Sequence, residues 1–198
     1  MDRTVASWRR QQRARLIAAR QAIGSDERSA ATERIAGRLK RVAAVLQSPV
    51  VGLYWPIRNE INLLRWGRAL AESEGVTLCL PVVVEPKAPL EYWRWTPGQA
   101  MRSGFWNIPV PTQRDVVLPD LMLAPLVGFD QGNYRLGYGG GYFDRTLASR
   151  DPRPIVIGVG YDFGALETIF PQPHDIPMHA ILTERRDTFP AAWRDHAE

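Results

Sequence analysis

Residues 121 to 147 read LMLAPLVGFDQGNYRLGYGGGYFDRTL, and this stretch decides the fold. It opens with an apolar run typical of a buried strand, passes through turn-forming residues 130 to 133, and places four glycines in the five positions 137 to 141. Glycines permit positive φ and close approach, so successive backbone N–H groups converge on an anion beside the start of a helix. The stretch therefore predicts a phosphate-binding turn. A tight turn that needs glycine for its geometry alone is the alternative.

Outward from this stretch, short apolar runs alternate with helical segments. Strands are predicted at residues 50–55, 76–84, 92–95, 121–127, 155–159 and 180–183, and helices at residues 61–74 and 141–149. Strands that are apolar throughout are typical of a parallel sheet covered on both faces. We therefore predict an α/β fold with a largely parallel central sheet flanked by helices on both faces. In such sheets ligands bind at the carboxyl ends of the strands.

The N-terminal part, residues 1 to 46, predicts a pair of helices separated at Gly24. Ser25-Asp26-Glu27 is a suitable start for the second helix, and one apolar stripe along it is predicted from Ile35, Leu39, Val42 and Leu46. Residues 50 to 184 would form the α/β core. Because no linker or internal repeat interrupts the sequence, residues 1 to 198 are predicted to form a single domain.

Composition excludes several classes of protein. Hydrophobic residues make up 45% and charged residues 23% of the 198 residues, which is ordinary for a packed globular chain and unlike a disordered one. Cys79 is the only cysteine, which excludes an internal disulfide framework, and the three histidines show no zinc-site spacing. No apolar run approaches the roughly 18 residues of a membrane span, and no secretory signal is recognisable. We therefore expect a cytoplasmic protein without a membrane partner.

The net charge of +4 is unevenly distributed, because residues 1 to 41 carry +7 and residues 42 to 198 carry −3. Lys40 and Lys87 are the only lysines, so arginine supplies nearly all of the basic charge. Guanidinium groups suit bidentate contact with phosphate, although a solvated helix face explains such a charge run equally well. A non-enzymatic nucleic-acid-binding protein is a further alternative. It is disfavoured because Trp8 is the only aromatic residue among these basic ones.

The glycine loop differs from two common phosphate-binding motifs. No Gly-Lys-Ser/Thr follows it, as in a Walker loop, and Tyr142 stands where a dinucleotide fingerprint needs its third glycine. Arg135 precedes the loop and provides a cation for phosphate, with a salt bridge that braces the turn as its alternative role. Asp144, in the first turn of the predicted helix, is placed to hold Mg²⁺.

The stretch GFDQGNYRLGYGGGYFDRTL, residues 128 to 147, closely resembles the signature of the 5-formyltetrahydrofolate cyclo-ligase family, also called methenyltetrahydrofolate synthetases. Four further features follow in the family's order. They are Arg9 and Arg13 in the N-terminal helix, LYWPIRNEI with Glu60, FWNIPVP with Trp106, and HDIPMHAILTE near the end of the chain. Together these stretches span nearly the whole sequence.

The resemblance implies an ATP- and Mg²⁺-dependent conversion of 5-formyltetrahydrofolate to 5,10-methenyltetrahydrofolate, with release of ADP and phosphate. Its substrate would be a reduced folate, with or without a polyglutamate tail, and the enzyme is expected to be a monomer without a nucleic-acid partner. A formamide oxygen is a poor leaving group, so its phosphorylation by ATP makes chemical sense before N10 of the folate attacks the carbon. Because fold alone does not fix function, a sugar-phosphate isomerase or an acyl-CoA-type transferase on a similar scaffold is the alternative.

The resemblance also implies roles for individual residues. ATP would be held by Arg9, Arg13, Arg135, Leu136, Gly137, Tyr138, Gly139, Gly140, Gly141, Tyr142 and Phe143. The folate would be held by Trp55, Glu60, Trp106 and Tyr142, with Glu60 and Arg135 in catalytic roles and Asp144 and Asp175 as magnesium ligands. Two positions depart from the family pattern, which commonly has lysine in place of Arg9 and an acidic residue in place of His179. For Glu60, a position favoured by the dipole at a helix N-terminus is the alternative.

Overall fold

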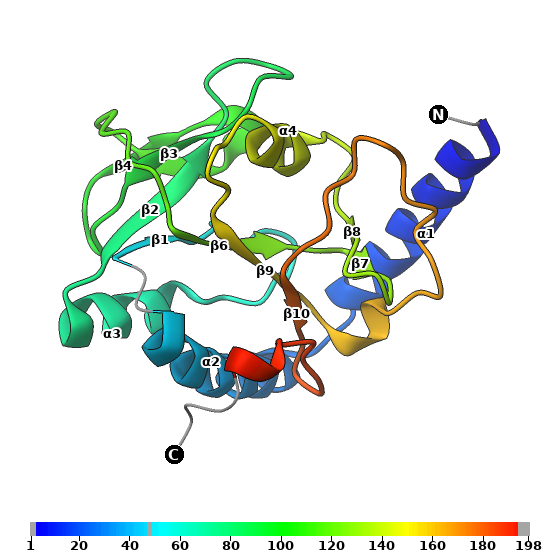
Figure 1. Cartoon of the computed structure of the whole chain (residues 1–198), viewed down its shortest axis with the longest axis horizontal. Coiled ribbons are helices and arrows are strands. Elements are labelled where there is room, and N and C mark those ends of the chain that lie inside the picture. The colour runs from blue at the N-terminus through cyan, green and yellow to red at the C-terminus, as the bar shows by residue number, and fades with distance from the viewer. Residues whose placement is uncertain (1–2, 47–48, 194–198) are drawn as a thin grey trace.

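A sheet of six strands forms the centre of the molecule (Figure 1), in the order β10-β9-β6-β1-β2-β3. The strands are β1 (Val50–Gly52), β2 (Thr77–Val82), β3 (Glu91–Arg94), β6 (Leu121–Pro125), β9 (Ile155–Val159) and β10 (Ala180–Leu182). All neighbours pair in parallel except β2 and β3. The computed structural model describes residues 3–46 and 49–193, with side chains over residues 4–40 and 49–193. The predicted largely parallel sheet is confirmed.

Helices cover both faces of this sheet, which explains why its strands are apolar throughout. On one face α2 (Ser25–Leu46) and α3 (Leu64–Glu74) pack against a cluster that contains Leu121 and Leu123. On the opposite face α4 (Tyr142–Ala148) packs against the neighbouring side chains of β6, Met122 and Ala124. Figure 1 shows α2 and α3 on one side of the strands and α4 on the other.

The predicted stripe on α2 is confirmed at Ile35 and Leu39, which are fully buried in this core. The side chains of Val42 and Leu46 lie outside the described residues. The predicted helix at residues 61–74 begins later, at Leu64, so Glu60 precedes α3 by four positions and its proposed place at a helix N-terminus is wrong.

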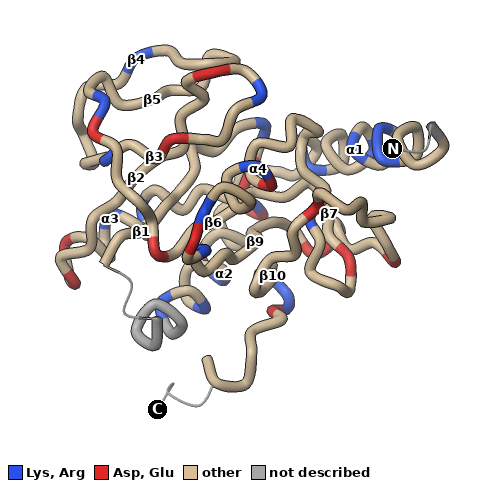
Figure 2. Tube along the Cα trace, turned by 45° about the horizontal axis from the view of Figure 1, so that its top comes forward, with Lys and Arg blue, Asp and Glu red and all other residues tan. Residues whose placement is uncertain are grey.

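Both predicted N-terminal helices are present, and the first, α1 (Arg3–Gln21), lies beside the carboxyl end of the sheet. Its Leu16 packs with Val127, Leu136 and Ile169 in a small separate cluster. The helix thereby contacts the hairpin of β7 (Gly128–Phe129) and β8 (Arg135–Leu136), which leads into the glycine loop. Figure 2 marks several basic positions along α1. The basic N-terminal segment is therefore brought next to the predicted phosphate-binding turn.

Two hairpins were not predicted from the sequence. One is the β7–β8 pair, and the other joins β4 (Met101–Ser103) to β5 (Pro109–Pro111) through a short turn, η1 (Phe105–Asn107). Their strands are only two or three residues long, too short for an alternating pattern to be recognised. Two more single turns, η2 (Asp162–Gly164) and η3 (Ala191–Trp193), complete the elements. Over the described ranges, no helix is both long and apolar enough to cross a membrane.

Candidate active site

A pocket of about 690 Å³ lies at the carboxyl ends of the central strands. Trp55 follows β1, Val83 follows β2 and Pro125 ends β6, and all three line it. The opposite wall comes from α1 and the glycine loop. The pocket therefore lies at the edge of the sheet where the fold class predicts a ligand.

The glycine loop needs glycine for its backbone geometry. Gly139 and Gly141 have φ values of +96° and +64°, a region that other residues rarely adopt. At Gly140 a Cβ atom would lie 2.8 Å from a ring carbon of Tyr142, so even alanine would clash there. The loop consequently lines the pocket with bare backbone from residue 139 to residue 141, where an anion can approach closely.

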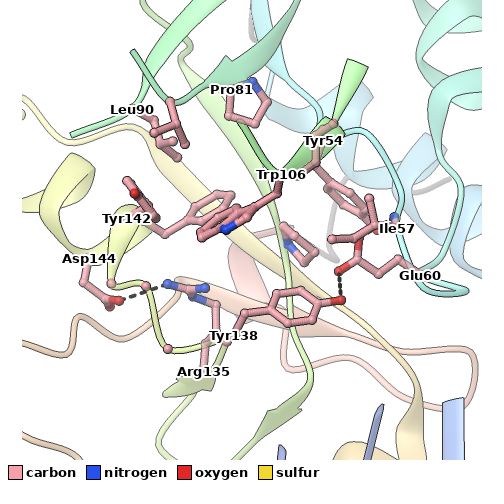
Figure 3. A pocket seen from close by; sticks show the side chains of 18 of the residues that line it. Tyr54, Ile57, Glu60, Pro81, Leu90, Trp106, Arg135, Tyr138, Tyr142 and Asp144 are labelled. Carbon is pink, nitrogen blue, oxygen red and sulfur yellow. Dashed lines mark hydrogen bonds and ion pairs between the residues drawn. The ribbon is translucent and has the colours of Figure 1, made fainter. Parts of the chain in front are cut away.

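Two arginines flank this loop with different partners. Arg13 donates from Nε to the Gly137 carbonyl at 2.7 Å, and its guanidinium lies close to Gly139. Burial and the neighbouring charge of Arg9 lower the pKa of Arg13, as expected where cations gather without enough anions. Arg135 donates from Nη2 to Asp144 at 3.0 Å (Figure 3), while its buried Nε has no hydrogen-bond partner among the described residues.

Arg9 also lines the pocket, but its donors are engaged within the protein. Nε donates to the Ile169 carbonyl and Nη2 to the Phe170 carbonyl, both at 2.9 Å, and Nη2 also pairs with Asp175 at 2.5 Å. Only 4% of Arg9 is exposed. These contacts hold the segment from residue 169 to residue 175 against α1 and leave Arg13 as the freer cation.

The predicted magnesium ligands, Asp144 and Asp175, both line the pocket, and both are paired with arginine. Asp175 additionally accepts a hydrogen bond from the backbone amide of Gln172 at 2.7 Å. Within residues 3–46 and 49–193, no three His, Cys, Asp or Glu side chains gather into an all-protein metal site. Mg²⁺ is commonly held by one or two carboxylates together with phosphate oxygens and water. Two carboxylates beside an open glycine loop fit that kind of binding.

The other end of the pocket holds Glu60, whose side chain is 3% exposed. Its Oε2 accepts from the Ile57 amide at 3.0 Å, and its Oε1 accepts from the Tyr138 hydroxyl at 3.0 Å (Figure 3). Burial raises the pKa of this carboxyl, and the Ile57 amide, Arg20 and Tyr138 oppose the shift without cancelling it. A buried carboxyl of this kind is suited to hydrogen bonding and proton exchange with a polar ligand.

Arg20 is a residue of this end that the sequence did not reveal. Its Nη1 lies 3.7 Å from Glu60 Oε1, and its Nη2 donates to the Tyr138 hydroxyl. The sequence contained one signal, a basic residue in the last turn of a helix, but that position is usual for reasons of helix stability. Arg58 and Tyr54 also line the pocket without having been predicted.

Aromatic side chains lie between the two ends. Trp106 is 62% exposed and extends across the middle of the pocket in Figure 3, with its ring edge-on to Tyr142 at 5.7 Å between centroids. Trp106 also has a φ of +55°, in the left-handed region. Trp55 is partly buried and lines the same pocket. Flat, accessible rings of this kind suit a planar heterocycle.

All but one of the predicted site residues line this pocket. The exception is Leu136, whose side chain is 1% exposed and packs into the cluster with Leu16, because β8 directs it toward α1. His179 also lies elsewhere. Its Nδ1 accepts from the Val156 amide at 3.0 Å beside a separate hollow, so it takes no part in the pocket that contains the two aspartates.

Fold and site together define a class of protein: an α/β enzyme with a deep pocket at the carboxyl edge of a mostly parallel sheet, with arginines and a glycine loop at one end and a buried carboxyl at the other. The profile of the 5-formyltetrahydrofolate cyclo-ligase family matches residues 5–184. The chain therefore belongs to the 5-formyltetrahydrofolate cyclo-ligase family, and is an enzyme of the ligase class.

Relatives and solved structures agree with this assignment. The chain is 29% identical to a 5-formyltetrahydrofolate cyclo-ligase from Mycolicibacterium smegmatis, over 89% of this chain and 93% of the relative. It is 30% identical to the protein of that name from Haemophilus influenzae, over 69% of this chain and 76% of the relative. The structure of the 5,10-methenyltetrahydrofolate synthetase from Aquifex aeolicus is similar with a TM-score of 0.78 and 27% identity, covering 90% of this chain and 91% of the other.

The synthetase structure from Mycoplasma pneumoniae has a TM-score of 0.72 at 23% identity, covers 93% of this chain and 99% of the other, and supports the fold. The family and the fold class predicted from the sequence are thus confirmed. The roles of individual site residues stay predictions.

Proposed function

We propose that this enzyme converts 5-formyltetrahydrofolate to 5,10-methenyltetrahydrofolate with consumption of ATP. One observation carries the proposal: a single pocket joins an arginine-flanked glycine loop to the buried carboxyl of Glu60. The reaction needs both ends, because a phosphoryl group must be transferred to the formyl oxygen of a bound reduced pterin. The relatives' names point to the same reaction.

At the glycine-loop end, the exposed backbone of residues 139 to 141 and the guanidinium of Arg13 would hold the ATP phosphates. Arg135 would neutralise charge on the transferring phosphoryl group while its bond to Asp144 keeps it in place. Phosphoryl transfer depends mainly on positioning and charge neutralisation, which such groups supply. Mg²⁺, when bound with the nucleotide near Asp144 and Asp175, would add charge neutralisation at the phosphates.

At the other end, the rings of Trp55 and Trp106 would hold the pterin and aminobenzoyl groups, with Glu60 oriented toward N10. The formyl oxygen attacks the γ-phosphorus of ATP and ADP leaves. N10 then forms a bond to the formyl carbon, the C–O bond breaks with release of phosphate, and N10 loses its proton. Glu60, whose pKa is raised by burial, would accept that proton.

The test is an absorbance assay near 360 nm for the methenyl product, with 5-formyltetrahydrofolate, ATP and Mg²⁺. Product is expected only when all three are present, and chelation of the metal is expected to stop turnover. Absence of product under every such condition would overturn the proposal.

A pair of glycine variants tests the glycine-loop end. Gly139→Ala is expected to raise KM for ATP at least tenfold. A residue with a Cβ atom is strained at the φ of +96° found here, and the added Cβ would lie 3.3 Å from the Arg13 guanidinium carbon and crowd it. Gly98→Ala is the matched control, since Gly98 has a similar φ of +87° but open space around it and lies outside the pocket. Both variants should lose a similar amount of folding stability, and only Gly139→Ala should raise KM for ATP. Equal KM values for ATP would exclude this role for the loop.

A further inference from the structure

Arg20, a buried residue of α1, connects that helix to three other parts of the molecule. Its Nε donates to the Arg58 carbonyl at 2.9 Å and its Nη1 to the Leu126 carbonyl at 3.5 Å. The same guanidinium contacts Glu60 and the Tyr138 hydroxyl. Only 3% of Arg20 is exposed. One side chain of α1 thus joins the turn before α3, the end of β6 and the glycine loop.

The turn that presents Glu60 is strained and fixed from outside. Arg58 and Asn59 have φ values of +47° and +60°, an unfavourable conformation for two consecutive residues other than glycine. Arg20 holds the first carbonyl of this pair, and the Tyr161 hydroxyl donates to the second at 3.1 Å. Strain of this kind persists only where surrounding contacts impose it, and it is concentrated at functional sites.

Tyr138 connects this turn to the glycine loop. It belongs to the loop, yet its hydroxyl points away from the phosphate-binding backbone and toward Glu60 (Figure 3). Two guanidiniums, those of Arg20 and Arg58, lie near its ring, each 5.6 Å from the ring centroid. The hydroxyl accepts a hydrogen bond from Arg20 and donates one to Glu60.

We propose that Tyr138 and Arg20 are positioning residues of the folate end, which hold the Glu60 carboxylate ionised and aimed into the pocket. Tyr138 is thereby assigned to the substrate side, although the motif around it suggests nucleotide binding. The inference rests on the proposed function, because it concerns the carboxyl assigned to the folate.

The charged and titratable groups around Glu60 support this assignment. Burial raises the pKa of Glu60, while the Ile57 amide, Arg20, the Tyr138 hydroxyl and Arg58 each lower it. Tyr54 is the remaining titratable group beside this carboxyl. Burial and the carboxylate raise the pKa of Tyr138 well above its usual value, so it remains a hydroxyl that can donate. Removing that donor would favour the protonated form of Glu60.

Tyr138→Phe tests the proposal, because it keeps the ring beside the two guanidiniums and removes only the hydroxyl. We expect kcat/KM for 5-formyltetrahydrofolate to fall about tenfold while KM for ATP stays within twofold. The acidic limb of the pH profile of kcat/KM should also move to higher pH, since Glu60 would protonate more readily. Tyr92→Phe is the matched control. It also removes a buried tyrosine hydroxyl, but Tyr92 neither lines the pocket nor holds the Glu60 turn, so this variant should leave the acidic limb in place.

An unchanged acidic limb in Tyr138→Phe, or a rise in KM for ATP alone, would overturn the proposal. A ¹³C NMR titration of the Glu60 carboxyl, assigned with Glu60→Gln, gives a readout that does not depend on turnover. Tyr138→Phe should raise that pKa in the ligand-free protein even if the wild type makes no methenyl product, so failure of the proposed function and failure of this inference are distinguishable. If Tyr138→Phe does not fold, Arg20→Lys replaces it in the same titration, with the same expected direction and an unchanged pKa as the contrary result.

Discussion

The two ends of the pocket are built in different ways. The glycine-loop end is built around one short segment, residues 135 to 144, whose backbone lies open to the pocket, and Arg13 and Asp175 add charged groups to it. The Glu60 end is assembled from distant parts of the chain: Arg20 is 38 residues from its partner Arg58, and Tyr138 is 78 residues from Glu60. The first end depends on local conformation and the second on burial. A change in the backbone should therefore damage the first, and the loss of one hydrogen-bonding atom should damage the second.

The carboxyls of the two ends also differ in their electrostatics. Burial acts to raise the pKa of Asp175, but hydrogen bonds from Arg9 and the Gln172 amide outweigh it and leave that pKa lowered. At Glu60 burial prevails, although Arg20 is near, and the pKa is raised. Asp175 pairs with its arginine at 2.5 Å, whereas Glu60 lies 3.7 Å from its own. Glu60 is also the more buried of the two side chains, 3% against 10% exposed, so the closer cation and the lighter burial both favour the charged form of Asp175.

The largest loss of activity is expected from Glu60→Gln, which keeps the shape of the side chain and removes its charge. Loss of a positioned base typically costs a factor of about 10² to 10⁴, so kcat/KM for 5-formyltetrahydrofolate should fall at least about 100-fold in a steady-state assay. Binding of an ATP analogue, measured by calorimetry, should change by less than about threefold.

Glu72→Gln on α3 is the matched control, since that carboxylate is 69% exposed and pairs only with Arg68 on the same helix. Its kinetic constants should equal those of the wild type. A Glu60→Gln enzyme that keeps full activity, or that loses ATP affinity instead, would remove the distinction between the two ends.

The contrast also explains what could be predicted from the sequence. The glycine loop and Asp144 were recognisable because their geometry follows from neighbouring residues. Arg20 was not, because its role arises only when α1 is packed against the end of β6, and neither periodicity nor spacing encodes that contact. The β4–β5 hairpin was missed for another reason, since its strands are too short to produce a pattern.

Arg9 and Arg13 also show that the sequence could predict a shared position but not the contacts made there. They lie one helical turn apart and predict a common face, and the structure confirms that both line the pocket. What the sequence could not provide is the segment from residue 169 to residue 175, which occupies the donors of Arg9. Likewise, Leu136 belongs to the motif, but its side chain packs into the core.

The second prediction separates these two arginines. Arg9→Ala leaves the carboxylate of Asp175, whose side chain is only 10% exposed, without its paired arginine. Breaking a buried pair of this kind typically costs about 3 kcal/mol or more in the free energy of unfolding. Arg13→Ala removes a half-buried side chain with one backbone bond and should cost less than about 1.5 kcal/mol. It should instead raise KM for ATP about tenfold. Urea denaturation and steady-state kinetics measure the two effects, and equal losses of stability would show that the arginines act alike.

The smallest effect concerns the pH dependence of stability, where the two ends should act in opposite directions. Asp175 has a lowered pKa in the folded protein, so its contribution is present above its unfolded pKa and is lost as the pH falls through the folded value. Glu60 has a raised pKa, so its contribution to stability is present below its unfolded pKa and is lost as the pH rises through the folded value.

Asp175→Asn should therefore make the rise of stability with pH shallower, and Glu60→Gln should make it steeper. Each change is limited to about one proton, or about 1.4 kcal/mol per pH unit. Urea denaturation between pH 2 and pH 7, roughly the range of carboxyl titration, measures both slopes. A steeper slope in both variants would mean that burial governs both carboxyls, and a shallower slope in both would mean that the paired cation governs both.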